Sequence, residues 1–280
     1  MKKGYSMFSF TEDADVAQKF HLIKAAGYDG AEPVMSEKGY LNQGSSEKEI
    51  LTIKQMADAE DLEIPSVGVW SLWENNLVSD SDAIRQKAED IIKKQIEIAA
   101  LLEADTILVV PGYVGCDFAS KPERIRYDVA YDRCVEAFRR LAPEAKVQIG
   151  IENVWNRFLL SPLEMKNLLD TVDSDYVGAY FDVGNVIYTG YPEDWIRILG
   201  KKYIKKIHLS DYRRDQSGLG AFVDLFAGDV DFKEVSDALK EIGYQDYLTL
   251  EMLPNYKKYP DMSVWSGKHA VDLIAQMCER

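Results

Sequence analysis

The sequence predicts a single α/β domain, a (β/α)8 barrel that spans residues 1–280. Three observations favour this fold: short β-rich runs alternate with longer amphipathic segments, eight such units follow one another, and no linker interrupts them. A chain of 280 residues is long enough, because such barrels typically need roughly 250 residues. An open, doubly wound sheet is the alternative, but no Gly-rich dinucleotide fingerprint follows the first predicted strand.

The eight predicted strands are short runs rich in Val, Ile, Tyr and Phe, as expected of buried strands. In chain order they cover residues 4–10, 29–34, 64–70, 105–111, 147–153, 177–183, 204–210 and 247–252. Between the strands, apolar residues recur at the spacing of one helix face. Two clear cases are Ile84, Ala88, Ile91, Ala99 and Leu102, and then Phe232, Val235, Leu239 and Ile242.

Capping signals mark where several helices begin and end. Ser161 supplies an N-cap hydroxyl, Pro162 suits the first helical position, and Glu164 completes a capping box. Helix C-caps are expected at two glycines, each followed by Tyr and a new strand. The further N-cap pairs and these glycines are Ser46 with Glu49, Asp231 with Glu234, Gly27 and Gly243.

Composition excludes several classes of function. The formal net charge is -14 and the pI is near 4.8, which disfavours binding to a phosphate backbone. No segment approaches the roughly 20 apolar residues of a membrane span, and no signal peptide is apparent. Three scattered cysteines do not form a disulfide framework. We therefore expect a cytoplasmic protein with neither a nucleic-acid nor a membrane partner.

Ionisable residues close the later strands of the predicted barrel. The carboxyl ends of barrel strands form the catalytic face, so these residues are the candidates for chemistry. The first, third and fourth strands end in apolar or aromatic residues, whereas charged or titratable residues end the second and the last four strands. These residues are Glu32, Glu152, Asp182, His208 and Glu251.

Four of them, on consecutive strands, predict a metal site: Glu152, Asp182, His208 and Glu251. Each lies in an apolar run, where an unpaired carboxylate costs several kcal/mol, and together they would repel one another without a cation. Three oxygen ligands and one nitrogen ligand suit Mn²⁺, Mg²⁺ or Co²⁺, and Zn²⁺ is also compatible. The other histidines, His21 and His269, fall in predicted helices and are expected to be surface or packing residues.

The segments that carry these residues are GIEN, YFDVGN, KIHLSD, FAGDVDF and LTLEM, in that order. They resemble the xylose isomerase-like TIM barrel superfamily, in its sugar-phosphate isomerase and epimerase branch. The chain looks most like the L-ribulose- and L-xylulose-5-phosphate 3-epimerases and the hexulose-6-phosphate isomerase-like proteins. The resemblance implies an isomerase of a sugar or sugar phosphate, a divalent metal ion held by the four residues, and a homodimer or homotetramer.

The resemblance also implies catalytic roles. Glu152 and Glu251 would exchange the substrate proton, one from each face of a metal-stabilised enediolate. Arg214 aligns with an arginine that contacts substrate oxygens in free-sugar epimerases, and Asp211 would orient a ligand or the substrate. Glu32 could reach the substrate or support a ligand, and Trp70 could form a wall of the pocket.

Two departures from the free-sugar epimerases favour a phosphosugar-like substrate. Asn185 replaces a histidine three residues after Asp182, and Leu159 replaces an acidic residue. Arg213, Arg214 and the Gly218–Gly220 turn are candidates for phosphate binding.

Four other functions are alternatives to a sugar or sugar-phosphate isomerase. An inosose dehydratase-type lyase would begin with the same proton removal, and hydroxypyruvate isomerase is a more distant relative. A nuclease of the endonuclease IV type needs several histidines at strand ends, where this chain has His208 alone. A non-catalytic sugar-binding barrel would not need the Glu152 and Glu251 pair.

Overall fold

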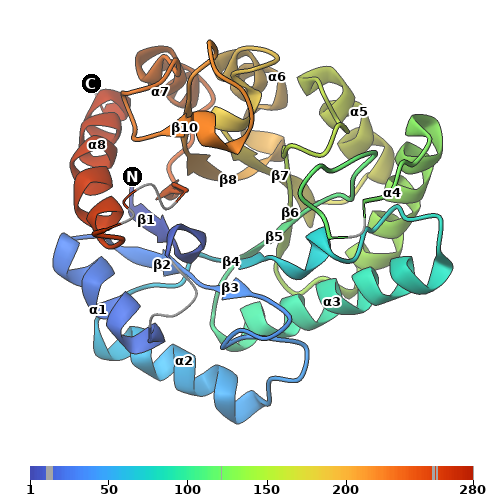
Figure 1. Ribbon diagram of the computed structural model, residues 1–280, viewed down its shortest axis with the longest axis horizontal. Coiled ribbons are helices and arrows are strands. Elements are labelled where there is room, and N and C mark those ends of the chain that lie inside the picture. Colours follow the sequence, from blue (N-terminus) through green and yellow to red (C-terminus); the bar gives the residue numbers. More distant parts are fainter. Residues whose placement is uncertain (11–14, 121, 254–255, 257, 280) are drawn as a thin grey trace.

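The computed structural model describes residues 1–10, 15–120, 122–253, 256 and 258–279 (Figure 1). Parallel strands form a central barrel, and helices surround it on the outside. The strands are β1 (Lys3–Ser6), β2 (Gly30–Glu32), β3 (Val34–Met35), β4 (Ser66–Val69), β5 (Thr106–Val109), β6 (Gln148–Glu152), β7 (Val177–Asp182), β8 (Ile204–Leu209) and β11 (Leu248–Leu250). The helices are α1 (Val16–Ala26), α2 (Glu47–Ala59), α3 (Asp82–Leu101), α4 (Tyr127–Leu141), α5 (Pro162–Val172), α6 (Pro192–Tyr203), α7 (Phe232–Glu241) and α8 (Met262–Glu279).

The sheet closes because one strand position is shared by β2 and β3. The strand order is β2-β1-β11-β8-β7-β6-β5-β4-β3, so β2 pairs with β1 and β3 pairs with β4. Only Pro33 separates the two short strands. Proline has no N–H to donate and interrupts the ladder, yet its carbonyl still accepts a 2.9 Å bond from the Gly68 N–H. The predicted (β/α)8 barrel is confirmed.

The ends of the predicted strands differ from the observed ones. The first strand stops at Ser6 and continues as a 3₁₀ turn, Met7–Ser9, because its ladder with β2 ends at the Ser6–Glu32 pair. The predicted strand 29–34 is divided at Pro33. A short antiparallel pair was missed: β9 (Asp211–Tyr212) and β10 (Phe222–Val223) form a hairpin beyond β8.

The helix caps follow the predicted pattern, with one difference. Ser46 and Glu49 form a complete capping box, and Gly27 ends α1 in the left-handed region at φ 91°. Ser161 accepts a bond from the Glu164 N–H, but the Glu164 carboxylate accepts from the Leu160 N–H instead of the Ser161 N–H. The box around Ser161 is therefore displaced by one residue. None of the helices in the described segments is long and apolar enough to cross a membrane.

The barrel places the carboxyl ends of β6, β7, β8 and β11 side by side. All six residues of β7 are buried, since helices cover the outer face of the barrel and side chains fill its interior. Asp182 on β7 lies directly opposite His208 on β8, and His208 lies opposite Thr249 on β11. Residues that are far apart in the sequence therefore meet at one mouth of the barrel.

Candidate metal centre and active site

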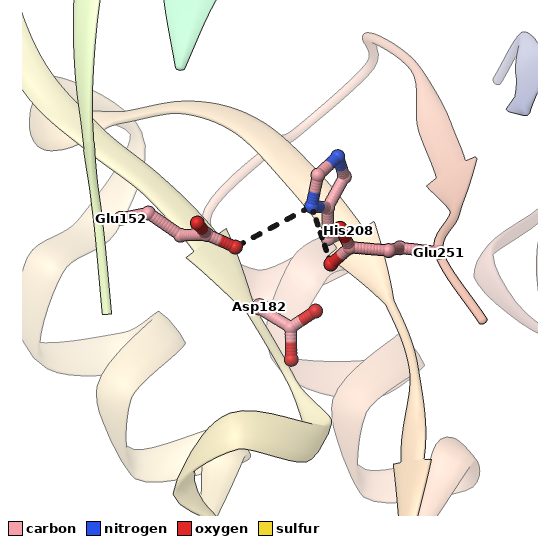
Figure 2. Close-up of side chains that lie close together, drawn as sticks. All are labelled: Glu152, Asp182, His208 and Glu251. Atoms are coloured by element: carbon pink, nitrogen blue, oxygen red, sulfur yellow. Dashed lines mark ion pairs between the residues drawn. The ribbon is translucent and has the colours of Figure 1, made fainter. Parts of the chain in front are cut away.

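Four side chains converge at this mouth, each from a different strand (Figure 2). Glu152 and Asp182 are the last residues of β6 and β7, and His208 is the fifth residue of β8. Glu251 follows β11 and is fixed by its N–H, which donates to the Leu209 carbonyl at 3.0 Å. One ligand atom from each of the four lies within 4.8 Å of the others. The structure thus brings together the residues singled out in the sequence.

His208 lies at the centre of this group. Its Nδ1 is 3.6 Å from Glu152 Oε1 and 3.2 Å from Glu251 Oε2. Nevertheless this buried nitrogen makes no hydrogen bond within the described part of the chain, and neither does Asp182 Oδ2. Buried polar atoms in native proteins are nearly always bonded, so two orphaned atoms in one cluster need a partner. A divalent cation fits them, because all the facing atoms are lone-pair donors of types that such ions bind.

Burial and mutual repulsion raise the pKa of two of these carboxyl groups. Burial, with Glu251 nearby, raises the pKa of Glu152 to about 8, although His208 partly opposes the rise. Burial, again with Glu251 nearby, raises the pKa of Asp182 to about 7. Burial alone would lower the pKa of His208, but Tyr180, Glu32 and Glu251 outweigh it and raise that pKa above its usual value. Raised carboxyl pKa values of this kind are expected where several buried acidic groups lie close together and no cation neutralises them.

Glu32 contacts the ring nitrogen of His208 that does not face the other three ligands. It is completely buried, and its Oε1 lies 2.9 Å from His208 Nε2. Burial would raise the pKa of Glu32, but His208, Ser66 and Tyr180 lower it to about 2. An ionised Glu32 holds a proton on Nε2, so Nδ1, which faces the other three ligands, is the nitrogen that would lose its proton and bind a metal. Glu32 therefore contacts the imidazole directly, which corresponds to ligand support among the two roles predicted for it.

Replacing Glu32 is expected to weaken metal binding without removing a ligand. Glu32→Gln keeps the shape of the side chain but removes the charge that favours the Nε2–H tautomer. We expect the affinity for Mn²⁺, measured by isothermal titration calorimetry, to fall about 10- to 100-fold. The control is Glu63→Gln, since Glu63 is half exposed and bonded to Lys2 and Tyr247, away from the cluster. An unchanged affinity in Glu32→Gln would contradict the orienting role.

Asp182 is held by Ser210, Asn185 and Asn153, of which only Asn185 was singled out in the sequence. Its Oδ1 accepts bonds from the Ser210 hydroxyl at 2.7 Å and from the Asn185 N–H at 2.8 Å. Asn153 brackets its backbone, donating to the Asp182 carbonyl and accepting from the Asp182 N–H. The available signal was adjacency, because Asn153 follows Glu152 and Ser210 lies two residues after His208. Polar residues next to predicted ligands were therefore worth testing as ligand supports.

A pocket of about 140 Å³, here called the central pocket, opens above the cluster. Its polar lining is Glu152, Glu251, Asn185 and Ser210. Its walls are aromatic and apolar, and include Phe8, Trp70, Trp73, Phe118, Trp155 and Phe222. Trp70, which is 47% exposed, packs against Phe8 at 6.2 Å between ring centroids. The carboxylates thus face a concave, mostly apolar space of the kind that binds small molecules.

The comparisons with known proteins agree with this architecture. The family described as xylose isomerase-like TIM barrel matches residues 20–267 of the chain. The chain belongs to this family. The predicted resemblance to xylose isomerase-like barrels is therefore confirmed.

The relatives similar to this chain include proteins named as an epimerase and as a dehydratase. A Haemophilus influenzae protein with the provisional name L-ribulose-5-phosphate 3-epimerase SgbU is 26% identical over 254 residues, covering 88% of this chain and 87% of that protein. An inosose dehydratase of Clostridium perfringens is 32% identical over 128 residues, covering 40% of this chain and 42% of that protein. The prediction of a sugar isomerase agrees with the first of these relatives.

Solved structures share the fold at low identity. The structure of D-psicose 3-epimerase in the presence of D-fructose covers 100% of both chains at a TM-score of 0.79 and 18% identity. The structure of the IolI protein with a bound zinc atom covers 99% of both chains at a TM-score of 0.79 and 19% identity. At these identities the likeness shows the barrel fold alone, so the chemistry is argued from the residues of this chain.

Asp211 and Arg214, which were predicted to bind substrate, contact other parts of the chain instead. Asp211 is buried, and its carboxylate accepts N–H bonds from Tyr212, Gly228 and Val230. These bonds tie the segment before α7 to the end of β8. Arg214 is exposed; its Nε donates to the Ile187 carbonyl at 3.0 Å, and its guanidinium lies over the ring of Tyr191. Neither residue lies among those that line the central pocket, whereas Asn185 and Trp70 do.

Proposed function

We propose that this chain is a divalent-metal-dependent epimerase or isomerase of a ketose or ketose phosphate. The observation that carries the proposal is the arrangement of Glu152 and Glu251, whose carboxylates enter the cluster from opposite sides of His208 (Figure 2). Two carboxylates on opposite faces of a substrate carbon allow one to remove a proton and the other to return it with inversion.

Glu152, Asp182, His208 and Glu251 would hold the metal, with Mn²⁺ preferred among Mn²⁺, Mg²⁺, Co²⁺ and Zn²⁺. When bound, such an ion polarises the carbonyl and adjacent hydroxyl of a ketose and so acidifies the proton between them. The orphaned Asp182 Oδ2 and His208 Nδ1 support this assignment. So does the oxygen and nitrogen ligand set, which contains no thiolate.

Different residues of the chain would then transfer the proton, exclude water and bind substrate hydroxyls. Glu152, enclosed by the apolar walls of the central pocket, removes or returns the proton on one face of the substrate carbon, and Glu251 does so on the other face. Glu152 and Asp182 lie deep in the mouth, and the aromatic walls around them reduce the access of water, which would otherwise weaken the base and compete for the proton. Asn185 and Ser210 present polar groups at the edge of the same space and are proposed to bind substrate hydroxyls.

A lyase of the inosose dehydratase type is the second candidate. The similarity to inosose dehydratase over 40% of this chain favours it, and the first step would use the same carboxylates. A dehydratase must also protonate a departing hydroxyl group, so the products distinguish the two reactions. An epimerase inverts the carbon without releasing water, whereas a dehydratase releases water and forms an unsaturated or deoxy product.

The test follows the substrate proton. We expect the chain, supplied with Mn²⁺, Mg²⁺ or Co²⁺ in D₂O, to incorporate deuterium next to the carbonyl of a ketose or ketose phosphate. The panel contains pentuloses, hexuloses and their phosphates, and NMR and mass spectrometry follow the label and the products. Incorporation must stop when EDTA removes the metal. The absence of metal-dependent label across the whole panel would contradict the proposal, and a dehydrated product would favour the lyase.

A further inference from the structure

A second pocket, here called the side pocket, lies next to the central one. It has a volume of about 380 Å³ and shares Val154, Trp155 and Asn185 with the central pocket. Asn185 also donates its N–H to Asp182, so the border between the two spaces is in direct contact with the candidate metal centre. A molecule bound at the centre could therefore extend past Trp155 into the side pocket.

The lining of the side pocket contains polar atoms without partners. Tyr212 is completely buried, yet its hydroxyl has no hydrogen-bond partner among the described residues, and the same is true of Trp155 Nε1. The two rings pack together, with centroids 5.0 Å apart, and Tyr188 lies beside Trp155 at 6.3 Å. A buried donor without a partner is unfavourable, because it has given up its hydrogen bonds to water. A ligand hydroxyl group that reaches these atoms would supply the missing partners.

The charge of this lining argues against a phosphate. Its two charged residues form an ion pair, in which Arg157 Nη2 lies 2.6 Å from Asp117 Oδ2, so their charges neutralise each other. Arg213 and Arg214, the arginines predicted to bind phosphate, donate to backbone carbonyls and are not among the lining residues. A phosphate dianion placed here would lose its hydration without gaining an uncommitted cation. The lining instead combines aromatic faces with neutral hydrogen-bonding groups.

We propose that the side pocket binds an uncharged, polyhydroxylated group attached to the ketose, such as a second sugar ring. This inference rests on the proposed function and names its substrate class: a glycosylated ketose. The aromatic side chains of Trp155, Tyr188 and Trp195 offer apolar faces to the sugar ring, while Tyr212 and Trp155 supply hydrogen-bond donors. The size of the side pocket relative to the central pocket is consistent with an added ring.

Saturation-transfer NMR on the full chain with Mg²⁺ tests the proposal without relying on turnover. The probes are D-fructose, D-fructose 6-phosphate and three ketose disaccharides, lactulose, leucrose and isomaltulose, which carry the second ring on different oxygens. We expect at least one disaccharide to bind about tenfold more tightly than fructose, with saturation reaching protons of both rings. Tighter binding of the phosphate than of every disaccharide, or saturation confined to the ketose ring, would overturn the proposal.

Two variants locate the second ring. Ser217 lies at the exposed edge of the side pocket, and Ser217→Trp should fill it, lowering disaccharide affinity about tenfold relative to fructose. Gln55→Trp, at an exposed position on α2 outside the barrel, is the matched control and should change neither affinity. Equal disaccharide affinity in wild type and Ser217→Trp would contradict the assignment.

Tyr212→Phe separates a binding role from a structural one. Because the hydroxyl has no partner among the described residues, its removal should leave the melting temperature unchanged or higher, while disaccharide affinity falls about threefold to tenfold. A lower melting temperature with unchanged affinity would overturn the role of Tyr212. These outcomes can be distinguished from those of the deuterium experiment. Binding of both rings without deuterium incorporation would contradict the proposed reaction. Deuterium incorporation without binding of the second ring would contradict only the side-pocket assignment.

Discussion

Glu152→Gln is expected to lower epimerisation by about a thousandfold, since a general base contributes roughly 10²–10⁴ to the rate. The amide has the same shape but no basic oxygen that can accept the substrate proton. Glu251→Gln should have an effect of similar size from the other face. The measurement is the rate of product formation from each epimer, with Glu97→Gln, an exposed position on α3, as the matched control.

Isotope exchange distinguishes proton transfer from mere metal loss. If each carboxylate serves one face, Glu251→Gln should still incorporate deuterium into the epimer whose proton faces Glu152, without forming the other epimer. Glu152→Gln should show the opposite preference. Metal content, measured by mass spectrometry, must accompany the assay because both residues are also proposed ligands. Full activity in either variant would exclude proton transfer by the replaced residue. If metal content and deuterium exchange fall by the same factor, the replaced residue binds the metal but does not transfer the proton.

The barrel and the convergence of the four candidate metal ligands could be predicted because both depend on patterns that are local in sequence. Eight apolar runs of strand length give the repeat, and a charged residue at the end of such a run marks the mouth of the barrel. Asp182 and His208 needed no further information, since neighbouring parallel strands bring their carboxyl ends together. The pairing of Glu32 with His208 lies across the barrel interior, so the sequence indicated the residue but left its role open.

The substrate side of the site depends on loops, and there the sequence was a weaker guide. Arg214 was predicted from the resemblance to free-sugar epimerases, and Asp211 was predicted to orient a ligand or the substrate. The chain, however, turns into the β9–β10 hairpin directly after β8. As a result, the Asp211 carboxylate accepts hydrogen bonds from backbone N–H groups, and the Arg214 guanidinium lies over the ring of Tyr191. The side pocket was not foreseen, because its walls come from the segments that follow β5, β6, β7 and β8, and no local pattern records how these segments pack.

Metal is expected to stabilise the chain, and to do so more strongly at pH 8 than at pH 5. At a concentration of 100 times its dissociation constant, a metal contributes about 2.7 kcal/mol, or roughly 5–10 °C in melting temperature for a chain of this size. The pH dependence arises from the metal-free state. Burial raises the pKa of Glu152 to about 8 and that of Asp182 to about 7, both well above their unfolded values near 4.

A carboxyl group whose folded pKa is raised favours the folded state most below its unfolded pKa, and this contribution is lost as pH rises through the folded pKa. The melting temperature of EDTA-treated protein should therefore decline between about pH 5 and pH 8. The raised pKa of His208 acts in the same direction, whereas Glu32, with a pKa lowered to about 2, stays ionised throughout this range. With Mn²⁺ present, the ionised carboxylates face a cation, and the decline should disappear. Differential scanning calorimetry with and without metal measures both curves; parallel curves from pH 5 to pH 8 would mean that the four residues do not share a cation.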